Sequence, residues 1–365
     1  MSPIELPDFP WDRLIPLRER ARNHPGGLCD LSVGTPVDPV PELIQRALAS
    51  AADAPGYPTT HGTSELREAI SDWLARRLGV IGVDPAAVLP AIGTKELIAG
   101  LPRLLGVHAG QQVVIPQTAY PTYEVGALLA HAQPVRADSL TQLGPSTPAM
   151  MWLNSPSNPT GRVLGVDHLR KVVQWARERG VLVVSDECYI ELGWTGDQPR
   201  SILDPDVCGP SHDGLLAVHS LSKRSNLAGY RFGFVVGDPG IVARLLEIRK
   251  HSGFMVPTPV QVAATAAYQD DAHVHAQRAV YRRRREQLLP ALQAAGFRVD
   301  DSAAGLYLWA TRGQRCMDTV EWLAERGILV APGDFYGPAG AEHIRVAITA
   351  SDERVHTASQ RLLAN

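Results

Sequence analysis

Residues 215–231 read LLAVHSLSKRSNLAGYR, and this stretch decides the fold class. Its first five residues are almost all apolar, and the polar motif 220–223 follows at once. A short, nearly continuous apolar run is typical of a strand that is buried on both faces of its sheet. The stretch therefore predicts a buried strand that delivers polar side chains to the edge of a sheet.

Similar apolar runs recur along the chain, and helical segments alternate with them. The predicted strands are Val88–Ile92, Gln112–Pro116, Met150–Asn154, Val181–Ser185, Leu215–His219 and Phe232–Val236. The intervening segments Ser64–Leu78 and Asp167–Arg179 carry apolar residues at helical spacing. This alternation predicts an α/β fold in which helices sandwich a mostly parallel sheet.

The chain contains few lysines, so a lysine with special chemistry has few candidates. Four lysines occur among 35 basic residues. Lys171 and Lys250 lie in charged, helix-like stretches, where a solvated position is expected, and Lys95 follows a Gly-Thr pair. Lys223 stands among hydroxyl groups, eight residues before Arg231. Because enclosure and a neighbouring cation lower the pKa of an amine, Lys223 is the best candidate for a nucleophile that binds an aldehyde.

Polar motifs follow four of the predicted strands, at the edge of the sheet where ligands bind in such folds. They are Gly93–Lys95, Asn158, Asp186 and Ser220–Lys223. Pyridoxal phosphate needs a lysine for its aldehyde, an anion beside its ring nitrogen, donors for its phosphate and a flat side chain against its ring. Each need has a candidate here, so we predict pyridoxal 5'-phosphate as the cofactor.

Asp186 is the candidate anion, because it ends an apolar strand that would carry its carboxylate into the interior. A buried carboxylate is costly without a cation, and a protonated pyridine nitrogen would supply one. A helix-capping or salt-bridged aspartate is the alternative. Tyr189, three residues later, could donate its hydroxyl to the phenolate oxygen of the ring, or could be a packing residue.

The turn Asn154–Gly161 contains two prolines that restrict the residues before them. Asn158 within it can direct its amide toward the same phenolate oxygen, although a loop without function would have a similar sequence. We also put forward a cis peptide bond between Asn158 and Pro159 as a hypothesis.

The phosphate requires N–H donors at a helix start together with cations and hydroxyl groups. The candidates are Gly93, Thr94, Lys95, Ser220, Ser222 and Arg231. For Thr94, an ordinary helix N-cap is an equal alternative. Tyr120 is the candidate for stacking on the ring, with core packing as a rival interpretation and Tyr123 as the less favoured choice.

Taken together, Ser-Leu-Ser-Lys with Arg231, Ser-Asn-Pro-Thr-Gly and Asp-Glu-Cys-Tyr resemble the fold-type I pyridoxal-phosphate enzymes of the class I and II aminotransferase family. The resemblance implies that Lys223 binds the cofactor and moves a proton during catalysis. It implies that Arg345 and Gly34 meet the α-carboxylate of the substrate, together with Asn158. It also implies that Tyr57 reaches the phosphate of a neighbouring subunit, so that the active unit is a homodimer.

The pattern along the chain also predicts two domains, because the part after Gly253 carries strand and helix signals of its own. We expect a large cofactor-binding domain at residues 41–280 and a smaller α+β domain built from residues 1–40 and 281–365. The run Arg282–Arg285 lies in a helical pattern, and we expect it to be a solvated helix face.

In overall sequence the chain most resembles the actinobacterial N-succinyldiaminopimelate aminotransferases. This implies transfer of an amino group from glutamate to N-succinyl-2-amino-6-oxopimelate, in lysine and diaminopimelate biosynthesis. The alternatives are an aminotransferase for aspartate, aromatic or other amino acids, and a carbon-sulfur β-lyase. A pyridoxal-sensing transcription regulator is disfavoured, because at most about 40 residues precede the fold and leave no room for a DNA-binding domain.

Composition sets outer limits on the partners and the compartment. The formal net charge of −3 comes from interspersed charges, which offers no support for a nucleic-acid or membrane partner. The four cysteines show no metal-binding spacing, and a reducing compartment suits them. With neither a signal peptide nor a long apolar run, we expect a cytoplasmic protein that uses small-molecule substrates and no metal.

Overall fold

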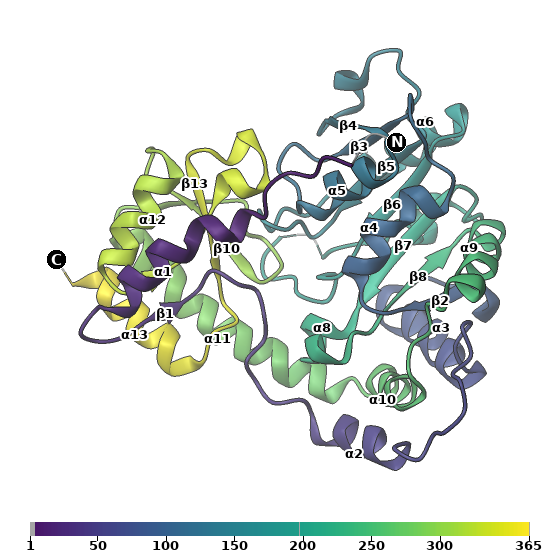
Figure 1. Ribbon diagram of the computed structural model, residues 1–365, viewed down its shortest axis with the longest axis horizontal. Coiled ribbons are helices and arrows are strands. Elements are labelled where there is room, and N and C mark those ends of the chain that lie inside the picture. The colour runs from purple at the N-terminus through teal and green to yellow at the C-terminus, as the bar shows by residue number, and fades with distance from the viewer. Residues whose placement is uncertain (1–3, 197, 365) are drawn as a thin grey trace.

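A seven-stranded sheet forms the centre of the larger part of the molecule (Figure 1). The structure is a computed structural model, and it describes residues 4–196 and 198–364. The strands of the sheet lie in the order β2 (Val88–Ala91), β8 (Gly233–Gly237), β7 (Leu215–Ser220), β6 (Leu182–Asp186), β5 (Met150–Asn154), β3 (Gln112–Ile115) and β4 (Gln133–Arg136). Strand β8 runs antiparallel to both of its neighbours, and the other pairings are parallel. The predicted α/β fold with a mostly parallel sheet is thereby confirmed.

Six of these strands were predicted within a residue or two, and β4 was not. Strand β4 forms the edge of the sheet, and its sequence Gln-Pro-Val-Arg contains little apolar surface. The periodicity of apolar residues gives no signal for such a strand, because an edge strand is covered on fewer sides.

Helices cover both faces of this sheet. One face packs against α4 (Thr94–Leu104), α5 (Thr122–Leu129) and α9 (Pro239–Ser252), and the other against α3 (Ser64–Leu78), α6 (Val166–Arg179) and α10 (Thr258–Gln269). Within β6, Val183 belongs to one apolar cluster and Val184 to the other. Both side-chain directions are therefore buried, which explains why the strands read as continuous apolar runs.

A second, antiparallel sheet forms the core of the smaller part. Its order is β12 (Ala331–Pro332), β13 (His343–Ala347), β10 (Tyr307–Thr311) and β9 (Arg298–Asp300), and it packs with α1 (Ile15–Arg22), α11 (Ala272–Ala294), α12 (Cys316–Glu325) and α13 (Asp352–Leu363). The N-terminal segment joins this part, since β1 (Cys29–Asp30) pairs with β11 (Ile328–Leu329).

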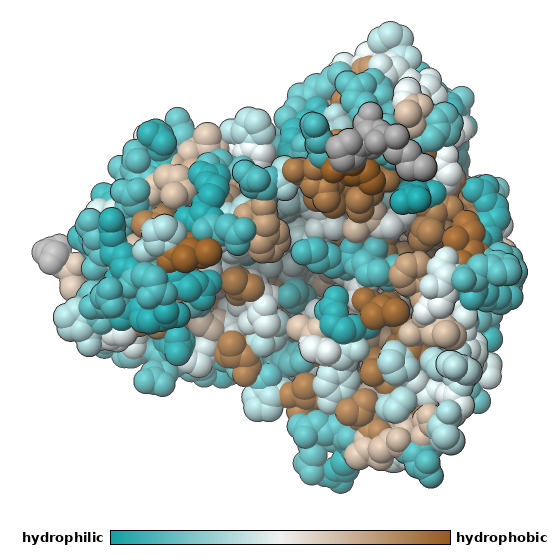
Figure 2. Space-filling model, viewed as in Figure 1, coloured by the Kyte–Doolittle hydropathy of each residue, from teal (hydrophilic) through white to brown (hydrophobic). Residues whose placement is uncertain are grey.

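Shorter elements complete the chain. Helix α2 (Glu42–Ser50) packs on α10. The remaining turns are η1 (Pro10–Leu14), η2 (Pro85–Ala87), η3 (Leu140–Leu143), α7 (Pro205–Cys208), α8 (Leu221–Arg224), η4 (Ala228–Tyr230), η5 (Gly333–Tyr336) and η6 (Pro338–Gly340). On the face shown in Figure 2, hydrophobic residues form separate patches among hydrophilic ones. Within the described ranges, no helix is long and apolar enough to cross a membrane.

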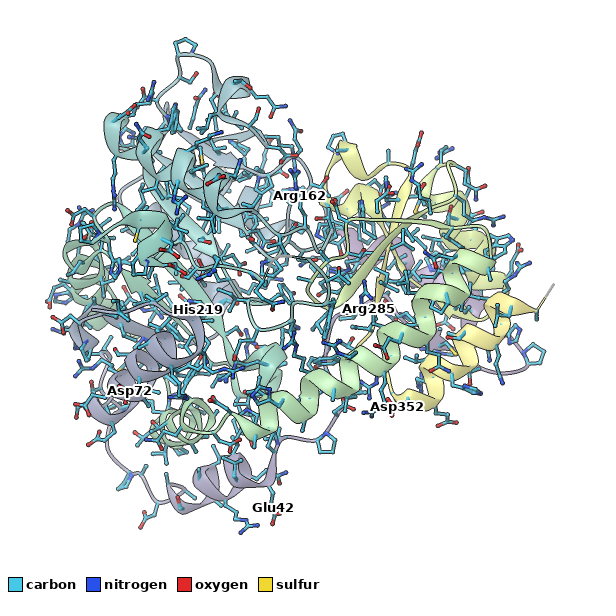
Figure 3. All side chains as sticks on the ribbon, turned by 180° about the vertical axis from the view of Figure 1, so that it is seen from behind. Glu42, Asp72, Arg162, His219, Arg285 and Asp352 are labelled. Atoms are coloured by element: carbon cyan, nitrogen blue, oxygen red, sulfur yellow. The ribbon has the colours of Figure 1, made fainter. Side chains whose placement is uncertain are left out.

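The arginine run on α11 is only partly the solvated face that we expected. Arg284 is 3% exposed and donates to both carboxylate oxygens of Asp38 and to Asp352. Figure 3 shows Arg285 along α11 and Asp352 at the start of α13. The expectation was wrong for Arg284, because one residue in each helical turn of such a run must face the neighbouring elements.

Candidate active site

A cavity of about 370 Å³ lies where the carboxyl ends of β6 and β7 approach the smaller part. Most of the predicted site residues line it: Gly34, Thr94, Lys95, Tyr120, Asn158, Asp186, Tyr189, Ser220, Ser222, Lys223, Arg231 and Arg345. Segments that are far apart in sequence thus meet in one place, as expected for strand ends of a parallel sheet.

Two predicted residues lie outside the cavity lining. Gly93 sits directly beside it, because a Cβ atom at this position would lie 2.3 Å from a guanidinium nitrogen of Arg231. Its φ of 77° also favours glycine. Tyr57 is 96% exposed and does not line this cavity. An exposure of this size is compatible with the predicted contact to a neighbouring subunit.

Lys223 lies on the short helix α8, and its ammonium group donates to the carbonyl oxygen of Gly34. Burial lowers the pKa of Lys223, and the cations Arg345 and Arg231 act in the same direction, while Tyr307 opposes them. A lowered pKa increases the fraction of free amine, which is the nucleophilic form. By contrast, Lys171 and Lys250 are exposed, as predicted.

Asp186 ends β6 and is 5% exposed. Its Oδ2 accepts a hydrogen bond of 2.7 Å from the Tyr123 hydroxyl, and its Oδ1 accepts one of 3.1 Å from the Cys188 amide. No ion pair to Asp186 occurs among the residues that the structure describes, and burial raises its pKa. A buried carboxylate that lacks a cation suits the protonated ring nitrogen of pyridoxal phosphate.

Tyr189 does not stand free in the cavity. Its hydroxyl lies 3.1 Å from the hydroxyl of Tyr307, the first residue of β10. Burial alone would raise the pKa of Tyr307, but the cations of Arg345 and Lys223 outweigh it and lower this pKa. The two tyrosines therefore form a hydrogen-bonded pair at the wall of the cavity.

Arg345 on β13 joins the smaller part to the turn that contains Asn158. It donates at 2.9 Å to the Asn158 carboxamide oxygen and at 2.7 Å to the Ser32 carbonyl, and its guanidinium lies 4.0 Å from the ring centre of Tyr307. Its Nε is buried and has no partner among the described residues. The bond to Arg345 uses the oxygen of Asn158 and leaves its amide hydrogens available for a ligand.

The Asn154–Gly161 turn is held from within. The backbone N–H of Asn158 donates to the Asn154 Oδ1 at 2.7 Å, so the side-chain amide of Asn158 is not used by this bond. The Asn158–Pro159 peptide bond is cis, as hypothesised, and so is the Ser155–Pro156 bond, which was not predicted.

Helix α4 begins at the cavity and presents its N-terminal amides there. Gly93 is its N-cap, so the alternative interpretation of Thr94 as an N-cap is wrong, and the Thr94 hydroxyl instead accepts a weak bond of 3.7 Å from the Cys188 thiol. Ser220 accepts a bond of 3.1 Å from the Ser222 amide. Together with Arg231, these groups form a positively charged, donor-rich site that suits a phosphate.

Two aromatic predictions need refinement. Tyr120 lines the cavity, and burial raises its pKa to about 12. Tyr123, the less favoured stacking candidate, is fully buried beneath Tyr120, and its hydroxyl donates a hydrogen bond to Asp186 instead. Trp11 also lines the cavity, and the Arg345 guanidinium lies 5.7 Å from its ring centre. Sequence reasoning missed the positions of Tyr123, Tyr307 and Trp11 at the site, because single aromatic residues look like core residues.

The charges around the cavity are strongly unequal. Its lining contains the cations Lys95, Lys223, Arg231 and Arg345, and one acid, Asp186. Lys95 is exposed, and its ammonium lies 5.7 Å from the ring centre of Phe9. Such an excess of cations favours ligands with several anionic groups.

Comparison with known proteins agrees with this geometry. The chain matches the family described as aminotransferase class I and II over residues 27–362. It is 66% identical to a probable aminotransferase of Mycobacterium tuberculosis, over 98% of this chain and 85% of that protein. It is 58% identical to the 4-dedimethylamino-4-oxo-anhydrotetracycline transaminase of Streptomyces rimosus, over 98% and 99%. A probable N-succinyldiaminopimelate aminotransferase structure from Thermus thermophilus superposes with a TM-score of 0.87 at 28% identity, over 97% and 99%.

Proposed function

Because the chain belongs to the class I and II aminotransferases, which use pyridoxal phosphate, we propose that it moves an amino group from glutamate to N-succinyl-2-amino-6-oxopimelate. When bound, the cofactor supplies an aldehyde that takes up the amino group and a ring that withdraws electrons. The observation that carries the proposal is the meeting of Lys223, Asp186 and Arg345 in one cation-rich cavity.

We assign each residue a role from its chemistry. Lys223 would hold the cofactor at its aldehyde carbon until the incoming amino group displaces it, and its freed amine would then take and return the proton at the substrate Cα, because its lowered pKa makes the amine available. Asp186 neutralises the protonated ring nitrogen. Arg345 binds the substrate α-carboxylate with its planar pair of N–H groups. The backbone of Gly34 lies beside this site, and its carbonyl accepts from Lys223.

The remaining site residues hold the cofactor. The amide of Asn158 and the hydroxyl of Tyr189 serve its phenolate oxygen, and Tyr120 covers its ring. The phosphate is bound by Gly93, Thr94, the Lys95 amide, Ser220, Ser222 and Arg231. Tyr57 completes the phosphate site of the partner subunit in a homodimer, and the enzyme acts in the cytoplasm.

The cation count supports an acceptor with an additional acidic group. Arg231, Arg345 and Lys223 are assigned to the phosphate, the α-carboxylate and the aldehyde, which leaves the Lys95 side chain for another anion. Lys95→Ala should raise KM for the succinylated acceptor at least tenfold and leave the cofactor absorbance intact, whereas Lys95→Arg should retain most of the affinity. Loss of the cofactor from Lys95→Ala would assign this side chain to the phosphate instead.

The decisive variant for the reaction class is Lys223→Ala. It should lose the absorbance of covalently bound cofactor and transamination together, while Lys171→Ala, the matched surface variant, should keep both. If Lys223→Ala still transaminates, the assignment is wrong.

A screen of acceptors with glutamate as donor, following 2-oxoglutarate release, tests the substrate. It should include the succinylated intermediate, oxaloacetate and aromatic 2-oxo acids. It should also include 4-dedimethylamino-4-oxo-anhydrotetracycline, because the 58% identity to the Streptomyces enzyme favours a ketone as the second candidate. Release of ammonia and pyruvate from cystathionine without any acceptor would indicate a lyase.

A further inference from the structure

A second cavity, of about 300 Å³, lies behind the Asn154–Gly161 turn and is separate from the cofactor cavity. Its inner wall is apolar and is formed by Val114, Leu143, Met151, Leu153 and Val172. Protein interiors contain few voids larger than a water molecule, and pockets for small ligands start at about this volume. The cavity is therefore large enough for a ligand with an apolar body.

The mouth of this cavity carries charges of both signs. Arg162 lies there, where the two parts of the molecule meet (Figure 3), and it has no ion pair among residues 4–196 and 198–364. Partial burial raises the pKa of Asp301, while the cation of Arg162 lowers it, the carboxylate of Asp300 raises it, His343 lowers it and the carboxylate of Asp138 raises it. Arg162, Asp138 and Asp301 all line this cavity.

The neighbouring Asp300 is already neutralised, because Arg298 and His343 both contact its carboxylate at 2.8–2.9 Å. Asp138 uses one oxygen to accept from the Gln117 amide. One guanidinium and two carboxylates with unused hydrogen-bonding capacity therefore remain at the mouth. This pattern is complementary to a zwitterion whose carboxylate meets Arg162 and whose ammonium meets Asp138 and Asp301.

The backbone at the mouth is also unusual. Asp301 and Ser302 have φ values of 48° and 56°, and both belong to residue types other than glycine. Ser302 and Ala304 donate backbone bonds of 2.8 and 3.0 Å to Thr160 and Gly161 in the turn. Strained residues of this kind gather at ligand sites and switch regions. The segment from the smaller part is thus tied directly to the turn that separates the two cavities.

Asn154 connects the two cavities. It lines the second cavity, and its Nδ2 donates to the Asp186 carbonyl at 3.0 Å while its Oδ1 accepts from the backbone N–H of Asn158 at 2.7 Å. Asn158 in turn accepts from Arg345. A ligand that shifts Asn154 therefore changes the support of Asn158 and, through it, the group assigned to the substrate carboxylate.

We propose that the second cavity is an effector site for an L-α-amino acid with an apolar side chain, and that its occupation alters substrate binding through Asn154. The side chain fills the apolar interior, and the ammonium and carboxylate groups remain at the charged mouth. No covalent step is involved. The site lies outside the residues assigned to catalysis, so its occupation and transamination can be measured independently.

Calorimetric titration of the holoenzyme with L-leucine and L-phenylalanine tests binding. An Arg345→Ala background weakens binding in the active site and leaves the second cavity intact. We expect one equivalent to bind, with leucinamide and 4-methylpentanoate at least tenfold weaker, because each lacks one charge of the zwitterion. Binding of either singly charged analogue as tightly as leucine would overturn the zwitterion assignment.

Two variants locate the binding. Leu143→Trp fills the cavity and should abolish leucine binding. Arg162→Ala changes an exposed residue, which folding tolerates, and should weaken leucine binding at least tenfold. Arg46→Ala on α2 is the matched control, since Arg46 is an exposed arginine that does not line the cavity. Binding that is unchanged in both Leu143→Trp and Arg162→Ala, or absent for every apolar amino acid tried, refutes the site.

The effect of the bound amino acid on substrate binding is tested separately, by steady-state kinetics. In the protein with native Arg345, leucine should change KM for glutamate at least twofold, and Leu143→Trp should remove this effect. Leucine that binds in the second cavity without any change in KM would disprove the link through Asn154.

Discussion

Replacing Tyr123 with phenylalanine removes one hydroxyl group beneath the cofactor cavity and leaves Asp186 with one hydrogen bond fewer. The bond is 2.7 Å long and buried, and its acceptor is a carboxylate. Hydrogen bonds to charged groups contribute about 1.5–3 kcal/mol. If the Asp186 carboxylate loses this much stabilisation in the transition state, kcat/KM decreases roughly tenfold to hundredfold.

The same substitution has a definite sign in the pH dependence. Burial raises the pKa of Asp186, and the bond from Tyr123 lowers it. Without this bond the pKa rises further, so Asp186 becomes protonated at a higher pH. Since activity requires the ionised form, the acid limb of the kcat/KM profile should move to higher pH in Tyr123→Phe.

Steady-state kinetics with glutamate across pH, together with the cofactor absorbance, measure both effects. Tyr268→Phe is the matched control, because Tyr268 is equally buried and its hydroxyl has no partner within the described part of the chain. We expect the control to keep the native profile. If Tyr123→Phe stays within twofold of the native enzyme with an unmoved acid limb, then Tyr123 does not support the anion.

Three further substitutions test packing and electrostatics. Arg284→Ala removes the buried guanidinium that donates to Asp38 and should lower the free energy of unfolding by about 1.5–3 kcal/mol, whereas the exposed Arg283→Ala should cost less than about 1 kcal/mol; equal losses in denaturant titrations would contradict a structural role for the Arg284–Asp38 pair. Gly34→Ala places a Cβ 2.1 Å from the Tyr307 hydroxyl, so KM for glutamate should rise at least tenfold, and an unchanged KM would show that the backbone can move away. Burial raises the pKa of Glu187 to about 7, from 4.5, so the folded state holds this proton more tightly than the unfolded state and stability falls by up to about 3 kcal/mol as the pH rises from 4.5 to above 7. Glu187→Gln should flatten this decrease in unfolding experiments at pH 5 and pH 8, and an equal slope would refute the assignment.

The sequence by itself determined the fold class and the chemistry of the reaction. Strands such as 215–220 are buried on both faces, and their continuous apolar runs can be recognised without any neighbour. Lys223 and Asp186 could be predicted because each directly follows or ends such a strand, where the topology leaves little freedom. Arg345 and Tyr57 were predicted by resemblance to a family and not by any local pattern, and the structure places Arg345 in the cavity while the role of Tyr57 stays a prediction.

The tertiary structure alone decided how the side chains divide the work. Tyr123 could be a stacking residue or a core residue in the sequence, and only its 2.7 Å contact with Asp186 gives it a role. Arg284 was predicted to be solvated, because a charge is buried only with a partner and its partner Asp38 is 246 residues away in the sequence. The second cavity has the same origin, since its walls come from both sheets. Local sequence specifies which backbone forms, whereas charge pairing and cavities depend on residues that only the folded chain brings together.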